Sequence, residues 1–383
     1  MLQNQKRILR PTSLKRLLQE VLPIPTTSYR EHGVQAYLEN FAKDRRLAFR
    51  LDPFGNAYIT YRHGQANRPF VLEAHMDHPG FVVTGVKGRR LTLEFRGGLS
   101  AEYGKGERVR IYGSEKQSNA VRARVTTVIS SKPTKRGMPK RIVGARAVLE
   151  SSGTVEVGDI ALWDVEVCRF RGRTVHGRQC DDLVGVVTVL ATLDRLVAEG
   201  RTGHLIGLFT RAEEVGLVGA AAAAAAKEIP EDALIVALET SSSAGGRAKQ
   251  GGGPIVRVGD REHIFSPVVT MWMTELAQKI ASTQSKFSYQ RKLMDAGGTE
   301  ATAFDLMGYE TGAACLALGN WHNAGPRNRV RAETVNLDDL EGLILLCEAM
   351  VTHARKAERT ITSRRRHWFK IGRTAGRRLK NEM

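Results

Sequence analysis

Apolar positions recur with two different spacings along this chain, and the changes between them divide it into parts. Residues 27–43 carry apolar side chains at i, i+3, i+4 and i+7, which predicts an amphipathic helix. Those side chains are Val34, Tyr37, Leu38 and Phe41. Apolar and polar residues then alternate over 47–51 and 57–61, on either side of a Gly55-Asn56 turn, and this pattern predicts a β-hairpin.

Between residues 81 and 173 the pattern consists of short alternating runs separated by turns that contain glycine. No helical periodicity in this stretch lasts beyond one turn. Short strands joined by such turns are typical of an all-β barrel. We therefore predict that residues 81–173 form an inserted β-barrel.

After this stretch, helical and strand patterns alternate again up to residue 354. Residues 181–199 are apolar on nearly every face, which predicts a deeply buried helix. Buried strands are predicted at 204–209, 233–238 and 313–318, and helices at 220–226, 267–281 and 336–354. This alternation predicts an α/β fold, in which residues 1–80 and 174–354 form a central mixed sheet flanked by helices.

The charge of the chain is concentrated at its C-terminus. The sequence has 58 Lys and Arg against 40 Asp and Glu, and a formal net charge of +18. Residues 355–383 hold eleven of the basic residues and two acidic ones, which gives this basic tail a net charge of +9. We expect a solvated or disordered extension. With Trp368 and Phe369 among its arginines, the tail also suits nucleic-acid phosphates or anionic membranes.

The cysteines and the hydropathy pattern indicate the cellular compartment of the protein. The four cysteines lie far apart and form no CxxC pair, which indicates free thiols in a reducing compartment, and we expect a cytoplasmic protein. The longest apolar run, residues 183–193, is shorter than the ~20 residues that span a bilayer. No membrane partner is therefore expected.

The first candidate for chemistry is the stretch VLEAHMDHPG, residues 71–80. Residues i and i+2 of a strand share a face, so the His75 ring and the Asp77 carboxylate can lie side by side. A carboxylate that takes the proton of one ring nitrogen leaves the other nitrogen for a metal ion. On its own, such a pair is more often a buried structural histidine.

Further acids and imidazoles follow at the predicted strand ends. Ligands in open α/β sheets bind outside the carboxyl ends of the strands, so these residues are expected at one rim of the sheet. They are His75, Asp181, Glu213, Glu214, Glu239 and His322.

Two divalent cations ~3.5–4 Å apart would account for this set, because such a pair needs a bridging carboxylate, further ligands for each ion and a free carboxylate to activate water. Asp181 can bridge, and Glu213 is left as the base. One ion would then take His75 and Glu239, and the other Glu214 and His322. Nitrogen and oxygen ligands without thiolate fit zinc, with cobalt or manganese as alternatives.

Five motifs now indicate a family. AHMDHPGFVV, GRQCDDLVGV, RAEEVGLVGA, GGTEATAF and NWHNAG resemble, in the same order, the motifs of the dinuclear metallo-aminopeptidases that include glutamyl aminopeptidase, deblocking aminopeptidases and the TET particles. The similarity covers about residues 14–354. It implies a zinc-peptidase type fold and the metal-dependent removal of N-terminal residues from peptides. It also implies homo-oligomers, commonly dodecamers, built through the inserted domain.

The resemblance also assigns roles to residues. It makes His75, Asp181 and Glu239 the ligands of one ion, and Asp181, Glu214 and His322 those of the other. Asp77 resembles the carboxylate that orients His75, and Glu213 matches the general base.

Three positions depart from the family pattern. Glu239 and Glu300 stand where the family usually has Asp, and His78 stands where it usually has Glu. The two longer acids keep an alternative open, a related dinuclear amidohydrolase that acts on N-acyl or other non-peptide amides. A second alternative is a non-catalytic scaffold that binds nucleic acid through the basic tail.

Overall fold

The structure is a computed structural model that describes residues 11–65, 68–113, 120–132, 140–246, 248–294, 297–354 and 357–381. Within these residues, eight strands form one mixed sheet in the order β1-β2-β12-β3-β13-β16-β14-β15. The strands are β1 (Ala48–Leu51), β2 (Ala57–His63), β3 (Phe70–His75), β12 (Gly203–Thr210), β13 (Leu234–Ser242), β14 (Ile255–Gly259), β15 (Gln290–Leu293) and β16 (Glu310–Leu318). β12, β3, β13 and β16 run parallel, so their carboxyl ends meet at one edge.

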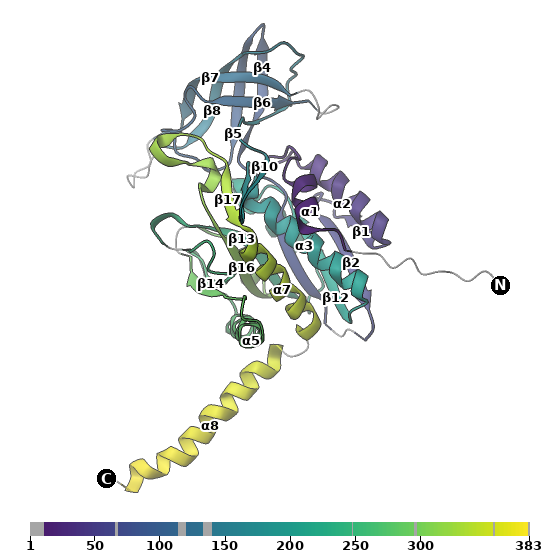
Figure 1. Ribbon diagram of the computed structural model, residues 1–383, viewed down its shortest axis with the longest axis vertical. Coiled ribbons are helices and arrows are strands. Elements are labelled where there is room, and N and C mark those ends of the chain that lie inside the picture. Colours follow the sequence, from purple (N-terminus) through teal and green to yellow (C-terminus); the bar gives the residue numbers. More distant parts are fainter. Residues whose placement is uncertain are drawn as a thin grey trace, which may run out of the picture.

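Helices cover both faces of this sheet (Figure 1). The larger apolar core includes residues of α1 (Leu14–Val21), α2 (His32–Arg45), α3 (Cys180–Glu199), α5 (Pro267–Thr283) and α7 (Leu337–His353). α4 (Val218–Ala225) and α6 (Glu300–Leu306) contribute to a smaller core on the other face. Strand β3 shows the reason for this division: Val71 packs into the smaller core while Phe70 and Leu72 pack into the larger one, because neighbouring residues point to opposite faces.

A closed barrel forms the second part of the molecule (Figure 1). Its strands in the described residues are β4 (Gly80–Lys87), β5 (Arg90–Arg96), β6 (Arg108–Tyr112), β7 (Val121–Ser130), β8 (Ile142–Leu149) and β9 (Ile160–Trp163). Phe81 and Trp163 pack edge to face inside it, with ring centroids 5.0 Å apart. The prediction of a mixed α/β fold with an inserted β-barrel is confirmed.

The predicted insertion also contains a strand that lies outside the barrel. β10 (Cys168–Arg171) pairs with β11 (Thr174–Gly177), which pairs with β17 (Glu333–Asn336). This three-stranded sheet joins the chain that leaves the barrel to a segment near the end of the α/β part. Its position places residues around 178 and 333 beside each other.

The basic tail, for which the sequence predicted a solvated or disordered extension, contains a helix, and most of its described side chains are exposed. α8 (Ala357–Asn381) begins beside α5 and extends away from the body of the molecule, where it is drawn in yellow (Figure 1). None of the helices that the structure describes combines the length and apolarity required to cross a bilayer.

Candidate metal centre

His75 lies at the end of β3 in the middle of the sheet, and its side chain is buried. Its Nδ1 lies 3.1 Å from the Asp77 carbonyl oxygen and 3.5 Å from Asp77 Oδ1. An Nδ1–H that donates to these acceptors leaves Nε2 without a proton. Nε2 faces Asp181, with Oδ1 at 3.5 Å.

Asp77 accepts hydrogen bonds from other groups besides the His75 ring. Its Oδ1 accepts a hydrogen bond from the Glu213 backbone N–H at 3.0 Å, and its Oδ2 accepts one from the Glu214 N–H at 3.2 Å. The Ser28 hydroxyl donates to the same Oδ2 at 2.6 Å. One buried carboxylate therefore orients His75 and also fixes the short 3₁₀ turn Glu213–Val215 that follows β12.

His322 lies in the segment between β16 and β17, in a left-handed conformation with φ 53°. Its Nδ1 donates to the backbone carbonyl of Gly98 at 2.5 Å, and Gly98 belongs to the loop after barrel strand β5. The opposite nitrogen, Nε2, lies 3.1 Å from Glu214 Oε1. Trp321 stacks on the imidazole at 3.6 Å between ring centroids. The barrel thus supplies the acceptor that orients this histidine.

Asp181 lies between the two histidines. It is buried at the start of α3, and its Oδ1 is 3.5 Å from His75 Nε2 while its Oδ2 is 3.6 Å from His322 Nε2. The two oxygens of one carboxylate therefore face two different imidazoles. This is the arrangement that a carboxylate bridging two cations requires.

Two groups of side chains around Asp181 bring their ligand atoms within 4.8 Å of one another. The first group is His75, Asp181 and Glu239, and the second is Asp181, Glu214 and His322. Among the described residues, the buried Glu239 Oε1 has no hydrogen-bond partner. A buried acceptor without a donor costs free energy, so a cation at this position fits the side chains present.

The charges around the centre support the same interpretation. Burial raises the pKa of Glu239 to about 8 and raises the pKa of Glu213 well above its ordinary value. Burial lowers the pKa of His75, but the surrounding carboxylates, Glu213 first, raise it well above the usual value. Several buried acids this close together are unfavourable unless cations neutralise them.

Two of the strand-end predictions need correction. Glu239 lies within β13, because this strand stays paired with β16 up to Ser242 and Leu318. Asp181 follows the small sheet and begins α3, so it does not end a strand of the main sheet.

The structure also places residues whose position the sequence did not reveal. Glu333, buried on β17, accepts hydrogen bonds from the Asp181 N–H at 3.0 Å and the His322 N–H at 2.8 Å, so it holds both backbones. Thr210 donates to Glu73 at 2.9 Å or to Glu300 at 2.6 Å. Glu300 is buried, and its carboxylate shares this hydroxyl with Glu73.

His78 is buried as well, with Nδ1 2.6 Å from the carbonyl oxygen of Asp181. It supports the backbone of the central aspartate.

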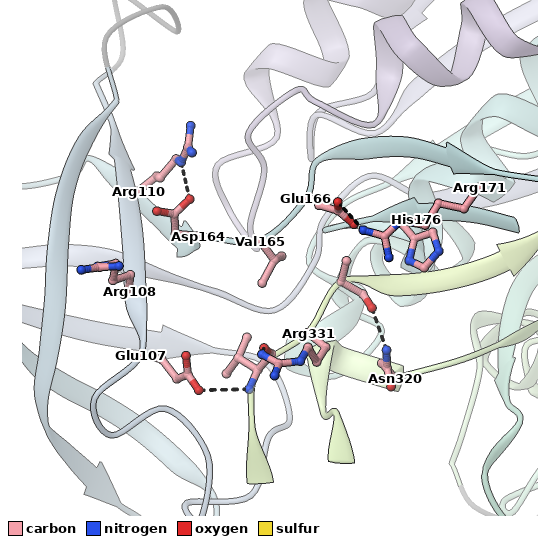
Figure 2. A pocket seen from close by; sticks show the side chains of 12 residues that line it. Glu107, Arg108, Arg110, Asp164, Val165, Glu166, Arg171, His176, Asn320 and Arg331 are labelled. Carbon is pink, nitrogen blue, oxygen red and sulfur yellow. Dashed lines mark hydrogen bonds and ion pairs between the residues drawn. The ribbon is translucent and has the colours of Figure 1, made fainter. Parts of the chain in front are cut away.

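A cleft of about 690 Å³ separates the barrel from the segment that carries His322. Figure 2 shows that some of its charged side chains pair with each other: Arg110 with Asp164, and Arg171 with Glu166 at 2.8 Å. Glu107 of the barrel accepts a hydrogen bond from the Val330 N–H at 3.4 Å. Asn320, two residues before His322, also lines the cleft, but none of the candidate ligands does, and its edges are joined by polar contacts.

Comparison with known proteins decides the family. The profile of the M42 glutamyl aminopeptidases matches residues 55–346, which is most of the chain and includes all of the candidate ligands. The chain belongs to this family. The resemblance predicted from the five motifs is confirmed.

Relatives and solved structures agree with this assignment. A protein of Acetivibrio thermocellus named "Putative aminopeptidase" is 26% identical over 350 residues, which are 87% of this chain and 97% of the relative. A structure of PhTET1-12s, described as a dodecamer, is 25% identical with a TM-score of 0.70, and the match covers 89% of this chain and 99% of the other. An aminopeptidase of the archaeon Desulfurococcus kamchatkensis is 21% identical and shares the fold, with a TM-score of 0.72 and coverage of 89% and 94%.

As an M42 peptidase, this chain is a metal-dependent aminopeptidase, and the prediction of an enzyme is confirmed. The alternative of a non-catalytic scaffold is thereby set aside.

Proposed function

We propose that this M42 peptidase binds two divalent cations, one through His75, Asp181 and Glu239 and the other through Asp181, Glu214 and His322. The proposal depends on one observation, the position of Asp181 with its two carboxylate oxygens toward two different imidazoles. Mixed nitrogen and oxygen ligands without a thiolate favour zinc, with cobalt or manganese as other occupants.

Cations bound there would lower the pKa of a bound water and polarise the scissile carbonyl. Glu213 belongs to neither proposed ligand set, and its Oε2 lies 3.9 Å from His75 Nε2. We assign it the role of general base. Its partly buried carboxylate accepts a proton from the attacking water, whose oxygen bonds to the carbonyl carbon, and returns the proton to the amine as the C–N bond breaks.

Asp77 has a supporting role in this mechanism. By accepting the Glu213 and Glu214 N–H groups while it orients His75, it fixes the base relative to one ligand of each ion. The expected substrates are peptides with a free N-terminus.

The substitution Glu213→Gln tests the assignment of the base. It keeps the size of the side chain and removes its basicity, so both metals should remain bound while the turnover of an aminoacyl-nitroanilide falls about 10²- to 10⁴-fold. Metal content is measured by mass spectrometry of the purified protein, and Glu39→Gln on the exposed surface of α2 is the matched control. Unchanged turnover with both metals bound would remove Glu213 from this role.

Substrate class is tested separately. A library of free and N-acylated peptides should lose residues only from the free N-termini. Preferred cleavage of the acylated members would instead favour the amidohydrolase alternative, to which the longer acids Glu239 and Glu300 point.

We also propose a homo-oligomer, in line with the dodecamer described for PhTET1-12s, with the barrel as the contact between subunits. Twelve chains of 42.2 kDa would give a particle of about 0.5 MDa. Light scattering of the full chain measures this mass, and a value near that of one chain would contradict the proposal.

A further inference from the structure

Helix α8 lies beyond the stretch that the M42 profile matches, which ends at residue 346. Its first turns are attached to α5: the Thr360 hydroxyl donates to Glu275 at 3.0 Å, and Arg364 forms an ion pair with the same carboxylate at 3.0 Å. Beyond these contacts the helix leaves the body of the molecule (Figure 1). The peptidase centre does not involve this helix.

The sequence of α8 is strongly basic, with nine Lys or Arg and one Glu in 25 residues. Arg366, Lys370 and Arg373 stand at i, i+4 and i+7, so they share one face of the helix. All three are exposed. This face presents positive charge to solvent.

Large apolar side chains lie beside that face and opposite it. Trp368 and Ile371, at i and i+3, share a side of the helix with Arg364, while Phe369, three residues after Arg366 and four before Arg373, borders the cationic face. Their exposed fractions are 67% for Trp368, 65% for Phe369 and 39% for Ile371. Three large apolar side chains within four residues, exposed on a projecting helix, form a surface that a partner would cover.

A hollow of about 430 Å³ lies where α8 meets α5. Apolar groups of Met271 and Trp368 line it together with the guanidinium groups of Arg291, Arg364 and Arg365. An apolar surface next to arginines matches a molecule that has a hydrocarbon part and an anionic head. A phospholipid has both.

We infer that α8 binds the surface of a bilayer that contains anionic lipids, with Trp368, Phe369 and Ile371 in the interface and the cationic side chains at the head groups. A basic helix with exposed aromatic and aliphatic side chains, whose long arginine side chains can reach the head groups, is the type that lies in the plane of such an interface. This is surface binding without a spanning segment, and it departs from the expectation that the protein has no membrane partner.

Two other binding partners fit the surface of α8 less well. A second α8 would bring like charges together, in a chain that already carries a net +18. A nucleic-acid duplex would satisfy the cationic face, but phosphate contacts would leave Trp368 and Ile371 exposed to water. The apolar side therefore separates the lipid surface from both.

The test uses co-sedimentation of the full chain with vesicles of phosphatidylcholine alone and of phosphatidylcholine with phosphatidylglycerol. We expect strong binding to the anionic vesicles and little to the neutral ones. A triple variant, Arg366→Gln, Lys370→Gln and Arg373→Gln, should weaken binding about a hundredfold, because each cationic side chain near an anionic surface contributes ~1 kcal/mol. The matched control removes the same charge from exposed lysines nearby, through Lys279→Gln, Lys286→Gln and Lys292→Gln, and should change binding less than about threefold.

The apolar side is tested by Trp368→Ser, Phe369→Ser and Ile371→Ser in one chain, which keeps every charge. Binding to anionic vesicles should fall at least about tenfold. Val157→Ser and Leu306→Ser, at side chains that are 68% and 67% exposed, are the controls and should not change it.

Each contrary result would overturn the inference. Equal binding by the apolar variant would mean attraction by charge alone. Duplex DNA bound more tightly than vesicles, with the apolar variant unaffected, would identify a nucleic-acid partner. A lower assembly mass of the apolar variant in light scattering would mean that α8 contacts another copy of the chain. Aminopeptidase activity on a soluble peptide should stay unchanged in every variant, which separates this result from the metal-centre proposal.

Discussion

The two proposed ligand sets differ in where their histidines find support. His75 ends a buried strand at the centre of the sheet, and Asp77, two residues later, orients its ring. His322 lies in a segment outside the main sheet, and its ring is oriented by the carbonyl of Gly98 from the barrel. One histidine is therefore supported from within the α/β part, while the other depends on two regions that meet.

This difference indicates that the two ions can be disturbed separately. A change in the barrel loop should weaken metal binding by the His322 set and leave metal binding by the His75 set unchanged. Asp181 and Asp77, by contrast, act on both sets, because the first contacts both imidazoles and the second holds Glu214 as well as His75.

The largest effect is expected from Asp181→Ala, which removes the carboxylate shared by both sets. Neither ion should then stay bound, and turnover should fall at least about 10³-fold, because the loss of metal removes several kcal/mol of transition-state stabilisation. Metal content and turnover are measured together, with Asp44→Ala on the surface of α2 as the control. Two ions retained by Asp181→Ala would show that the sets are not linked through this residue.

A smaller effect that still reaches both sets is expected from Asp77→Asn. An amide has one acceptor oxygen instead of two, so it cannot serve Ser28 and both glutamate N–H groups as the carboxylate does. Affinity for both ions should fall about 10- to 100-fold, the usual result of changing a group that orients ligands. Titration with a competing chelator measures it. If only one affinity falls, Asp77 serves only the His75 set.

An effect confined to one set is expected from Gly97→Ala. Gly97 has φ +126°, and a Cβ there would lie 2.7 Å from Pro79 Cβ, so the loop that presents the Gly98 carbonyl must shift. Affinity for the ion of His322 should fall about tenfold while that for the other ion stays unchanged.

Gly106→Ala is the matched control for this substitution, because Gly106 also has a positive φ, +82°, but has open space around the added Cβ. It should bind both ions normally. An equal loss of both ions in Gly97→Ala would contradict the separate support of His322.

The smallest effect is expected from Glu239→Asp, which introduces the acid usual in the family. The pairing of β13 with β16 holds the backbone at Glu239 opposite Cys315, so the shorter side chain loses one methylene of reach and little else. Metal affinity should change less than about threefold, which is under 1 kcal/mol. A loss above tenfold, measured by the same titration, would show that the His75 set depends on the longer acid.

Much of this arrangement could be predicted from the sequence, because adjacent residues carry it. His75 with Asp77, and Glu213 with Glu214, are close in the chain, and a buried strand before each pair places it at the carboxyl ends of the parallel strands β3 and β12. The spacing of apolar residues predicted α3, whose all-round burial follows from packing between the sheet, α1 and α7.

The features of the site that the sequence did not predict are contacts between distant segments. Nothing in the stretch around Gly98 indicates that its carbonyl meets an imidazole 224 residues later, because every residue has a carbonyl. Glu333 was missed for a similar reason: a single acid on a short strand has no sequence pattern that reveals two backbone N–H partners. The helical form of the basic tail was also missed, since its charge resembles that of solvated extensions.

The Gly98 carbonyl has a practical consequence for anyone who exchanges barrels between relatives to redesign their particles. A junction placed at the ends of the barrel still replaces the carbonyl that orients His322. In such a chimera the support of this proposed ligand would change together with the barrel, so metal content has to be measured beside particle mass.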